Sequence, residues 1–148
     1  MAQKITPFLW FDGKAEDAAK FYAAVFKSAK LGKTVAGPDG KAMVVPFEIE
    51  GQQFTALNGG PQFKFNESVS FVVHCKDQKE VDYYWDKLTS GGGQESMCGW
   101  LKDKYGLSWQ IVPEVLPRLM SGPKAGKVMQ AFMQMRKFDI AALERAAA

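Results

Sequence analysis

The sequence predicts an α+β protein built from two βαβββ modules and a C-terminal helical tail. First, in both halves a strand phenylalanine is followed, 13 and 14 positions later, by an aromatic pair: Phe8 by Phe21 and Tyr22, and Phe71 by Tyr84 and Trp85. Second, short apolar runs separated by glycine-bearing turns are typical of antiparallel strands. Third, the pattern after Pro113 changes to helical spacing. The two halves are thus offset by 63 residues, as expected for an internal duplication.

The first module spans about residues 4 to 60. Its opening stretch, "ITPFLWFDG", predicts a buried strand that ends at an Asp-Gly turn. The next stretch predicts a helix because its apolar residues recur at helical spacing: Ala18, Phe21, Tyr22, Val25 and Phe26. The runs "AMVVPFEIE" and "QFTALN" predict an antiparallel meander, in which Pro46 indicates an edge position or a bulge.

The second module spans about residues 66 to 113 and repeats this order. "SVSFVVHC" predicts a strand, and "KDQKEVDYYWDKLTSGGG" predicts a helix with a glycine stop. "ESMCGWLKD" and "GLSWQIVP" then predict a hairpin. One such module is too small to close a core alone, so we expect two of them to form a sheet that curls around a cavity.

The tail, about residues 114 to 148, predicts short helices. Its last helix should begin at the cap residue Asp139. Val128, Phe132 and three methionines, Met129, Met133 and Met135, cluster on one side of the preceding helix. We expect this apolar face to cover the outer surface of the sheet or to pack on a partner chain, which favours a homodimer.

Composition narrows the classes of function. The 148-residue chain has a net charge of only +3 with scattered lysines, so we expect no nucleic-acid partner. It contains no apolar run of the ~20 residues that a membrane helix needs, and its start lacks the pattern of a signal peptide. Two cysteines, Cys75 and Cys98, make neither a disulfide framework nor a zinc site, so we expect a cytoplasmic location.

Several stretches carry a resemblance to a known family: "FLWFDGKAEDAAKFY", "FEIEGQQFTALNGGPQFKFNESVSF", "EVDYYWDKL" and "CGWLKDKYGLSWQIVP". Over about residues 4 to 145 the chain resembles the PhnB-like branch of the vicinal oxygen chelate superfamily, also called the glyoxalase/bleomycin-resistance/dioxygenase fold. Members of this branch often carry the family name "3-demethylubiquinone-9 3-methyltransferase". The resemblance implies a single domain over residues 1–148, with a cavity built from paired modules within one chain or across a dimer.

The methyltransferase activity in that family name conflicts with the residues. Common S-adenosylmethionine enzymes need a glycine-rich turn between a strand and a helix, followed by an acidic residue for the ribose. The chain has no G-x-G-x-x-G, and "SGGGQ" follows a predicted helix, where it serves as a stop. We therefore rank this activity last among the alternatives.

The resemblance also implies where a metal would bind. Enzymes of the superfamily usually hold a divalent metal with His, Glu or Gln on the first and last strands of each unit. By strand register these positions fall near Thr6 or Pro7, among residues 54 to 58, near Ser68 and on Gln110. Only Gln110 is a usual ligand type, although Glu67 stands beside Ser68. We therefore expect no cofactor, and the alternative is a divalent metal held by Glu67 and Gln110.

Neither the lone histidine nor the cysteines predict catalysis. His74 lies at the far end of its predicted strand from Ser68, about 20 Å away. His74 and Cys75 are neighbours on a strand, so their side chains should point to opposite faces. We interpret His74, Cys75 and Cys98 as structural residues.

The remaining hypothesis is a ligand pocket on the concave face of the sheet. Candidate pocket residues are Trp10, Asn58, Phe63, Phe65, Ser68, Trp100, Trp109 and Gln110, although adjacent Trp109 and Gln110 cannot both point inward. We expect a small-molecule-binding protein without demonstrable enzyme activity. The alternatives are a metal-dependent glyoxalase or dioxygenase, and the methyltransferase of the family name.

Overall fold

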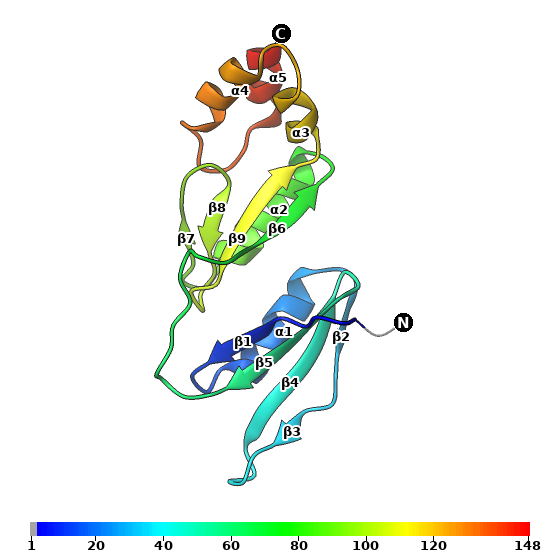
Figure 1. Ribbon diagram of the computed structural model, residues 1–148, viewed down its shortest axis with the longest axis vertical. Coiled ribbons are helices and arrows are strands. Elements are labelled where there is room, and N and C mark those ends of the chain that lie inside the picture. Colours follow the sequence, from blue (N-terminus) through cyan, green and yellow to red (C-terminus); the bar gives the residue numbers. More distant parts are fainter. Residues whose placement is uncertain (1–2) are drawn as a thin grey trace. The chain divides into compact units, whose positions relative to one another are not determined.

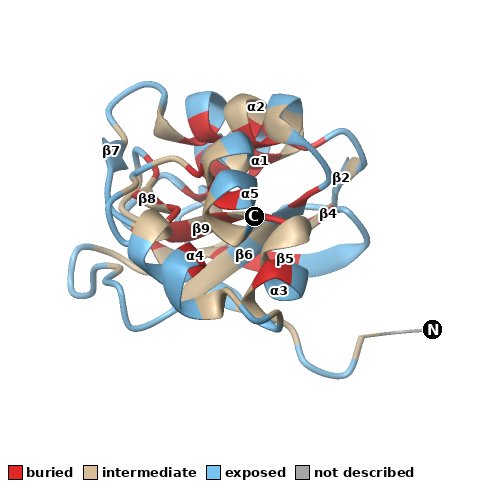
Figure 2. Ribbon diagram, turned by 90° about the horizontal axis from the view of Figure 1, so that it is seen from above, coloured by how far each residue is buried: buried red, intermediate tan, exposed pale blue. Residues whose placement is uncertain are grey.

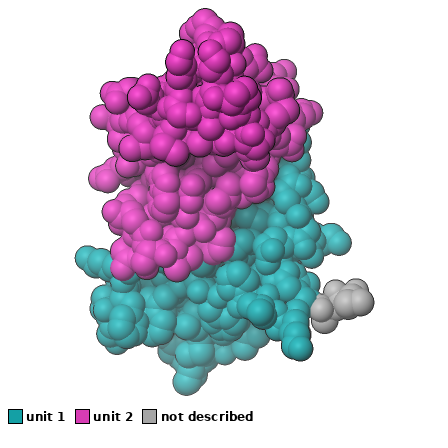
Figure 3. All heavy atoms as spheres, turned by 45° about the horizontal axis from the view of Figure 1, so that its top comes forward, with its two compact units in different colours: residues 1–65 teal, residues 66–148 magenta. Residues whose placement is uncertain are grey.

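The computed structural model describes residues 3–148 and divides into two compact units, residues 1–65 and 66–148 (Figures 1 and 3). Each unit contains one sheet and one long helix, and the second unit also carries the tail. The predicted α+β class with a helical C-terminus is confirmed, and the strands form two sheets, one in each unit. Among residues 3–148, no helix has the length and apolar character needed to cross a bilayer.

The first unit follows the predicted βαβββ order, with an extra short strand in the meander. Its elements are β1 (Phe8–Phe11), α1 (Ala15–Val25), β2 (Ala29–Leu31), β3 (Val35–Ala36), β4 (Ala42–Ile49) and β5 (Gln52–Asn58). The strand order is β1-β5-β4-β2, with β3 also on β4, and β1 runs parallel to β5. Pro46 lies in β4 between the segments that pair with β2 and with β3, at an interruption of the neighbouring strands.

One face of this sheet is buried beneath α1. The rings of Phe47 and Phe54 stack with centroids 5.2 Å apart, and Tyr22 of α1 stacks on Phe47 at 5.8 Å. All three side chains are almost fully buried. The helix begins without a capping side chain of its own at Lys14. Instead Asn58, at the end of β5, accepts a 2.9 Å hydrogen bond from the Ala15 amide, which satisfies one of the unpaired donors of the first turn.

The second unit repeats the topology in a four-stranded sheet. Its elements are β6 (Ser70–Cys75), α2 (Gln78–Thr89), β7 (Gln94–Glu95), β8 (Trp100–Lys102) and β9 (Ser108–Pro113), in the order β6-β9-β8-β7. β6 and β9 are parallel, and β8 and β9 form the predicted hairpin. Asp77 caps α2 by accepting a 2.9 Å hydrogen bond from the Glu80 amide. Figure 2 shows the buried face of α2 in red and its solvent face in pale blue.

The tail forms α3 (Val115–Met120), α4 (Ala125–Phe132) and α5 (Ile140–Ala147). These helices pack around their own buried cluster of Leu119, Val128, Phe138 and Leu143. The predicted cap is confirmed, because Asp139 accepts a hydrogen bond from the Ala142 amide.

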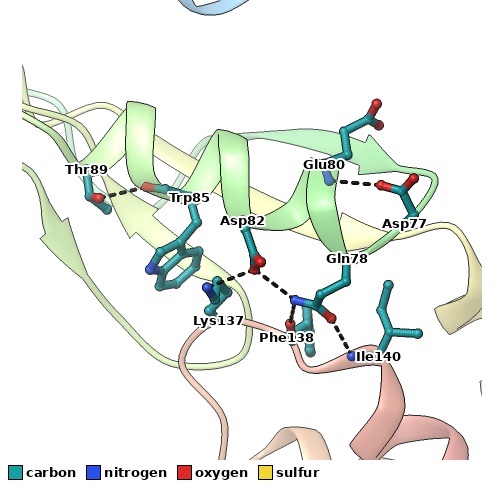
Figure 4. Close-up of polar contacts among 9 residues, drawn as sticks. All are labelled: Asp77, Gln78, Glu80, Asp82, Trp85, Thr89, Lys137, Phe138 and Ile140. Carbon is teal, nitrogen blue, oxygen red and sulfur yellow. Dashed lines mark hydrogen bonds and ion pairs between the residues drawn. The ribbon is translucent and has the colours of Figure 1, made fainter.

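The tail is fastened to α2 by polar contacts. Gln78 donates to the Phe138 carbonyl at 2.9 Å and accepts from the Ile140 amide at 2.8 Å, and Lys137 pairs with Asp82 at 2.8 Å (Figure 4). The chain segment that joins α4 to α5 is thereby held beside α2.

The internal repeat is real, but its strand register was predicted wrongly by one residue. Sequence alignment placed Phe8 on Phe71 and Thr55 on Gln110. In the parallel ladders Phe8 lies opposite Thr55, whereas Val72, not Phe71, lies opposite Gln110. The cause is loop length: three residues separate β1 from α1, and two separate β6 from α2. Because one residue changes the face of a strand, Phe8 and Phe71 point to opposite faces of their sheets.

Candidate functional site

The face of the first sheet that α1 leaves open carries a cleft with a volume of about 380 Å³. Its lining includes charged, amide and hydroxyl side chains and consists of Thr6, Lys30, Leu31, Gly32, Pro46, Phe47, Glu48, Gln53, Phe54 and Thr55. All belong to the first unit. The volume lies within the range of small-molecule pockets, and the lining is a mixed one of the kind that orients a ligand.

A row of three polar side chains crosses the cleft. Lys30 of β2 lies opposite Glu48 of β4, which lies opposite Gln53 of β5. Directly opposed residues project to the same face with Cβ atoms about 5 Å apart. A cation, a carboxylate and an amide therefore stand side by side on three strands, where one small polar ligand can reach all of them.

The second row of the cleft is nearly apolar. Pro46 lies opposite Thr55, whose side chain is 9% exposed. At the sheet edge the Gly32 amide donates to the Pro46 carbonyl at 2.7 Å. A Cβ at Gly32 would stand 2.9 Å from the Pro46 Cβ and 3.1 Å from its carbonyl oxygen, so only glycine allows the edge to approach this closely. The cleft thus has a tightly packed wall beside its polar row.

The predicted pocket residues of the first unit lie outside this cleft. The Trp10 indole donates to the Gly60 carbonyl at 2.9 Å, and Phe63 packs edge-on against it at 4.9 Å. Phe65 packs edge-on against Phe11, at 5.3 Å. Both polar atoms of the Asn58 side-chain amide form hydrogen bonds within the protein. The nitrogen donates to the Ala42 carbonyl, and the oxygen caps α1. The aromatic contacts hold the segment after β5 against the sheet. A contact of these residues with a ligand stays a prediction.

The predicted residues of the second unit are distributed over both faces. Trp109 is buried, and its indole donates to Asp103 at 2.9 Å. Gln110 projects to the opposite face, where its amide donates to the Ser70 hydroxyl at 2.9 Å. Trp100 lies opposite Gln110 on β8 and therefore shares its face. The structure thus brings Trp100 and Gln110 together and separates both from Trp109.

Ser68, the third position predicted for a metal ligand, lies outside the strands of the second sheet. Ser68 lies in the turn before β6, where its amide and hydroxyl both donate to Asn66 Oδ1. Ser70 begins the strand and faces Gln110. The neighbouring Glu67 pairs with Lys102 at 2.9 Å, and the Lys102 ammonium lowers the pKa of that carboxyl. Within residues 3–148, no three His, Cys, Asp or Glu side chains lie close enough together to hold a metal ion.

The cysteines differ in environment. Cys75 is fully buried, and burial, with smaller contributions from Glu80, Asp77 and Glu114, raises its thiol pKa to about 12. A thiol with so high a pKa is a poor nucleophile at neutral pH. His74, its neighbour on β6, is exposed. Its side chain therefore lies on the other side of the sheet from Cys75, as alternation predicts.

Sequence reasoning missed the polar row of Lys30, Glu48 and Gln53. One signal was present: "FEIEGQQF" alternates apolar and polar residues, which places Glu48 on the face opposite Phe47. Its two partners could not be found this way, because cross-strand pairing depends on the register of three strands.

Comparison with known proteins is consistent with this fold. The family model described as 3-demethylubiquinone-9 3-methyltransferase matches residues 3–112, which end just before the tail. No curated protein matches the chain. Among solved structures, a PhnB protein from Bacillus cereus, described as a 3-demethylubiquinone-9 3-methyltransferase, is 32% identical with a TM-score of 0.69. That match covers 75% of this chain and 99% of the other.

Two more distant structures share the fold. The protein PA1353 from Pseudomonas aeruginosa is 18% identical with a TM-score of 0.64, covering 76% of this chain and 98% of its own. The fosfomycin resistance protein FosX from Listeria monocytogenes, solved with Mn(II) and sulfate, is 14% identical with a TM-score of 0.52. That match covers 75% of this chain and 91% of the other.

Proposed function

The chain is a member of the 3-demethylubiquinone-9 3-methyltransferase family, within the vicinal oxygen chelate superfamily, and from that premise we propose that it binds a small molecule without using a metal. The observation that carries this proposal is the cleft of about 380 Å³ on the open face of the first sheet. Its polar row offers Lys30 as a donor and Glu48 as an acceptor. A ligand with both a donor and an acceptor, attached to an apolar body, fits this lining.

The residues at the superfamily's metal positions do not fit a metal. The open-face positions of the two units are Thr6 and Thr55 in the first, and Ser70 and Gln110 in the second. Hydroxyls are weak ligands for divalent ions, so Gln110 is the one usual ligand type among these four positions. This supports a binding protein rather than a metal-dependent enzyme.

Metal analysis followed by a ligand screen tests the proposal. We expect dialysed protein to contain well below one equivalent of divalent metal, and a thermal-shift screen of small polar metabolites to give a stabilising ligand. Substituting Glu48→Gln or Thr55→Val should abolish that shift, whereas Glu16→Gln, on the exposed surface of α1, should leave it unchanged. A ligand whose shift survives both cleft substitutions would overturn the cleft as the site.

A metal-dependent glyoxalase or dioxygenase is the second candidate. It is favoured by Gln110, a usual ligand type that projects to the open face, and by the Mn(II) named for FosX. Stoichiometric metal that is lost in Gln110→Ala would establish this candidate instead. The methyltransferase of the family name would require tight binding of S-adenosylmethionine, which calorimetry measures directly.

The partner and the location are also proposals. The exposed Met129 and Met133, 47% and 53% exposed, support association into a homodimer, which sedimentation measures. Two free cysteines, Cys75 and Cys98, support a reducing, cytoplasmic location.

A further inference from the structure

The second unit has a pocket of its own, about 170 Å³ in volume, between β7, β8, β9 and the turn before β6. It is lined by Glu67, Gln94, Glu95, Ser96, Trp100, Leu101, Lys102 and Ser108. None of these residues belongs to the cleft of the first unit. The pocket is large enough for a carboxylate with a small ring, but too small for a nucleotide or a cofactor.

An unpaired hydroxyl lines this pocket. Ser108 is completely buried, and its Oγ has no hydrogen-bond partner anywhere in the described part of the chain. A buried polar group without a partner is costly, and native proteins leave few of them. Since Ser108 belongs to the pocket lining, a ligand atom that accepts or donates a hydrogen bond there would remove this cost.

A cation stands directly beside that hydroxyl. Lys102 of β8 lies opposite Ser108 of β9 in the antiparallel ladder, so the two side chains project to the same face. One oxyanion can therefore accept from both. Trp100 lies two residues from Lys102 on the same face and also lines the pocket. Its ring supplies the apolar surface that the body of a ligand would need.

A carboxylate of the protein already occupies part of this arrangement. Glu67 Oε1 lies 2.9 Å from the Lys102 ammonium. The Glu67 side chain is 62% exposed and comes from a turn rather than from a strand, so it can move away without disturbing the sheet. It reaches Lys102 but leaves Ser108 unpaired.

We propose that the pocket of the second unit binds the carboxylate of a small organic acid, which Lys102 and Ser108 hold and for which Glu67 is the displaceable internal competitor. The pocket selects a single negative charge, because Glu95 and the displaced Glu67 at its border repel a polyanion such as phosphate. The inference is independent of the ligand of the first unit, since the two pockets share no residue.

The test is a titration of the full ¹⁵N-labelled chain with sodium benzoate at constant ionic strength, followed by NMR. We expect saturable shifts of the Trp100 indole N–H and of the Ser108 amide. Benzamide, which has the same shape without the charge, should give none. The variant Glu67→Gln should bind benzoate about fivefold more tightly, because it no longer pairs with Lys102. The gain is modest because an exposed ion pair such as Glu67–Lys102 is weak.

Variants of the two donors complete the test. Lys102→Met and Ser108→Ala should each weaken benzoate binding at least tenfold with a well-dispersed spectrum, whereas Lys104→Met, two residues further along the hairpin, should not. Equal binding of benzamide, or tighter binding of inorganic phosphate, would overturn the carboxylate as the ligand class. An unchanged affinity in Glu67→Gln would overturn its role as competitor. Absence of saturable shifts even in Glu67→Gln would overturn the site itself, whatever the cleft of the first unit binds.

Discussion

The indole of Trp109 donates a 2.9 Å hydrogen bond to Asp103 Oδ2, and both side chains are only 3% exposed. The second oxygen of the same carboxylate accepts from the amides of Tyr105 and Leu107 at 2.9 and 3.1 Å. One buried carboxylate therefore closes the turn between β8 and β9 and fixes the largest side chain of β9. The sequence predicted the turn, but the side-chain link to Trp109 was missed.

Replacing Asp103 should destabilise the second unit strongly. Asp103→Ala leaves the Trp109 indole and two backbone amides without their acceptor inside the protein. We expect the free energy of unfolding, measured by urea denaturation, to fall by about 3 kcal/mol. Asp39→Ala is the matched control, because Asp39 likewise accepts from a backbone amide in a turn, that of Lys41, but at an exposed position. Similar losses in the two variants would contradict the role of Asp103.

Replacing Asn58 should loosen the start of α1. Asn58→Ala removes the acceptor of the Ala15 amide and the donor to the Ala42 carbonyl. We expect a loss of about 1–2 kcal/mol in the free energy of unfolding, with faster hydrogen exchange at the Ala15 amide. Asn66→Ala, which loses only exposed bonds to Ser68, should cost less than half as much. Unchanged exchange at Ala15 would show that Asn58 is not the cap.

The architecture was predictable because it depends on patterns within short stretches. Apolar residues at helical spacing gave α1 and α2, and glycine-bearing turns gave the meander. The strand register was not predictable in the same way. The turn before α1 is one residue longer than the turn before α2. An alignment that counts back from the helices therefore equates Phe8 with Phe71, although the two side chains point to opposite faces of their sheets.

The candidate site was less accessible from the sequence, because its contacts join residues far apart in the chain. Asn58 caps a helix that begins 43 residues earlier, and Gln110 reaches Ser70 across 40. Composition and spacing flagged both residues as polar groups at strand positions. Which partner each meets depends on the register of paired strands, so the sequence did not reveal that Gln110 contacts Ser70.

Removing the Gln78 bridge should release the tail. Gln78 holds the Phe138 carbonyl and the Ile140 amide at 2.9 and 2.8 Å. We expect Gln78→Ala to raise the rate of tryptic cleavage after Lys137 by about fivefold, because about 1 kcal/mol of local stability is lost. Lys79→Ala, at the exposed neighbouring position, is the control. Equal cleavage rates would mean that the cluster around Phe138 and Leu143 holds the tail alone.

The stability of the protein should fall at alkaline pH because of Cys75. Its folded-state pKa of about 12 exceeds the ordinary value of 9.0, chiefly because burial penalises the thiolate. Because the pKa is raised in the folded state, the unfolded chain loses the thiol proton first as pH rises. The contribution of the Cys75 thiol to stability is therefore complete below about pH 9 and is lost progressively toward pH 12. Between pH 8 and pH 11 we expect the free energy of unfolding to decline by about 3 kcal/mol more in the wild-type chain than in Cys75→Ala.

Urea denaturation at each pH measures this difference, and the comparison cancels the titration of tyrosines and lysines that both chains share. Cys98→Ala, at the partly buried second cysteine, is the control for the loss of a cysteine as such. Iodoacetamide gives an independent readout, because the folded wild-type chain should be alkylated at Cys98 well before Cys75. If wild-type and Cys75→Ala stabilities run parallel across this pH range, the buried thiol does not resist ionisation as its surroundings predict.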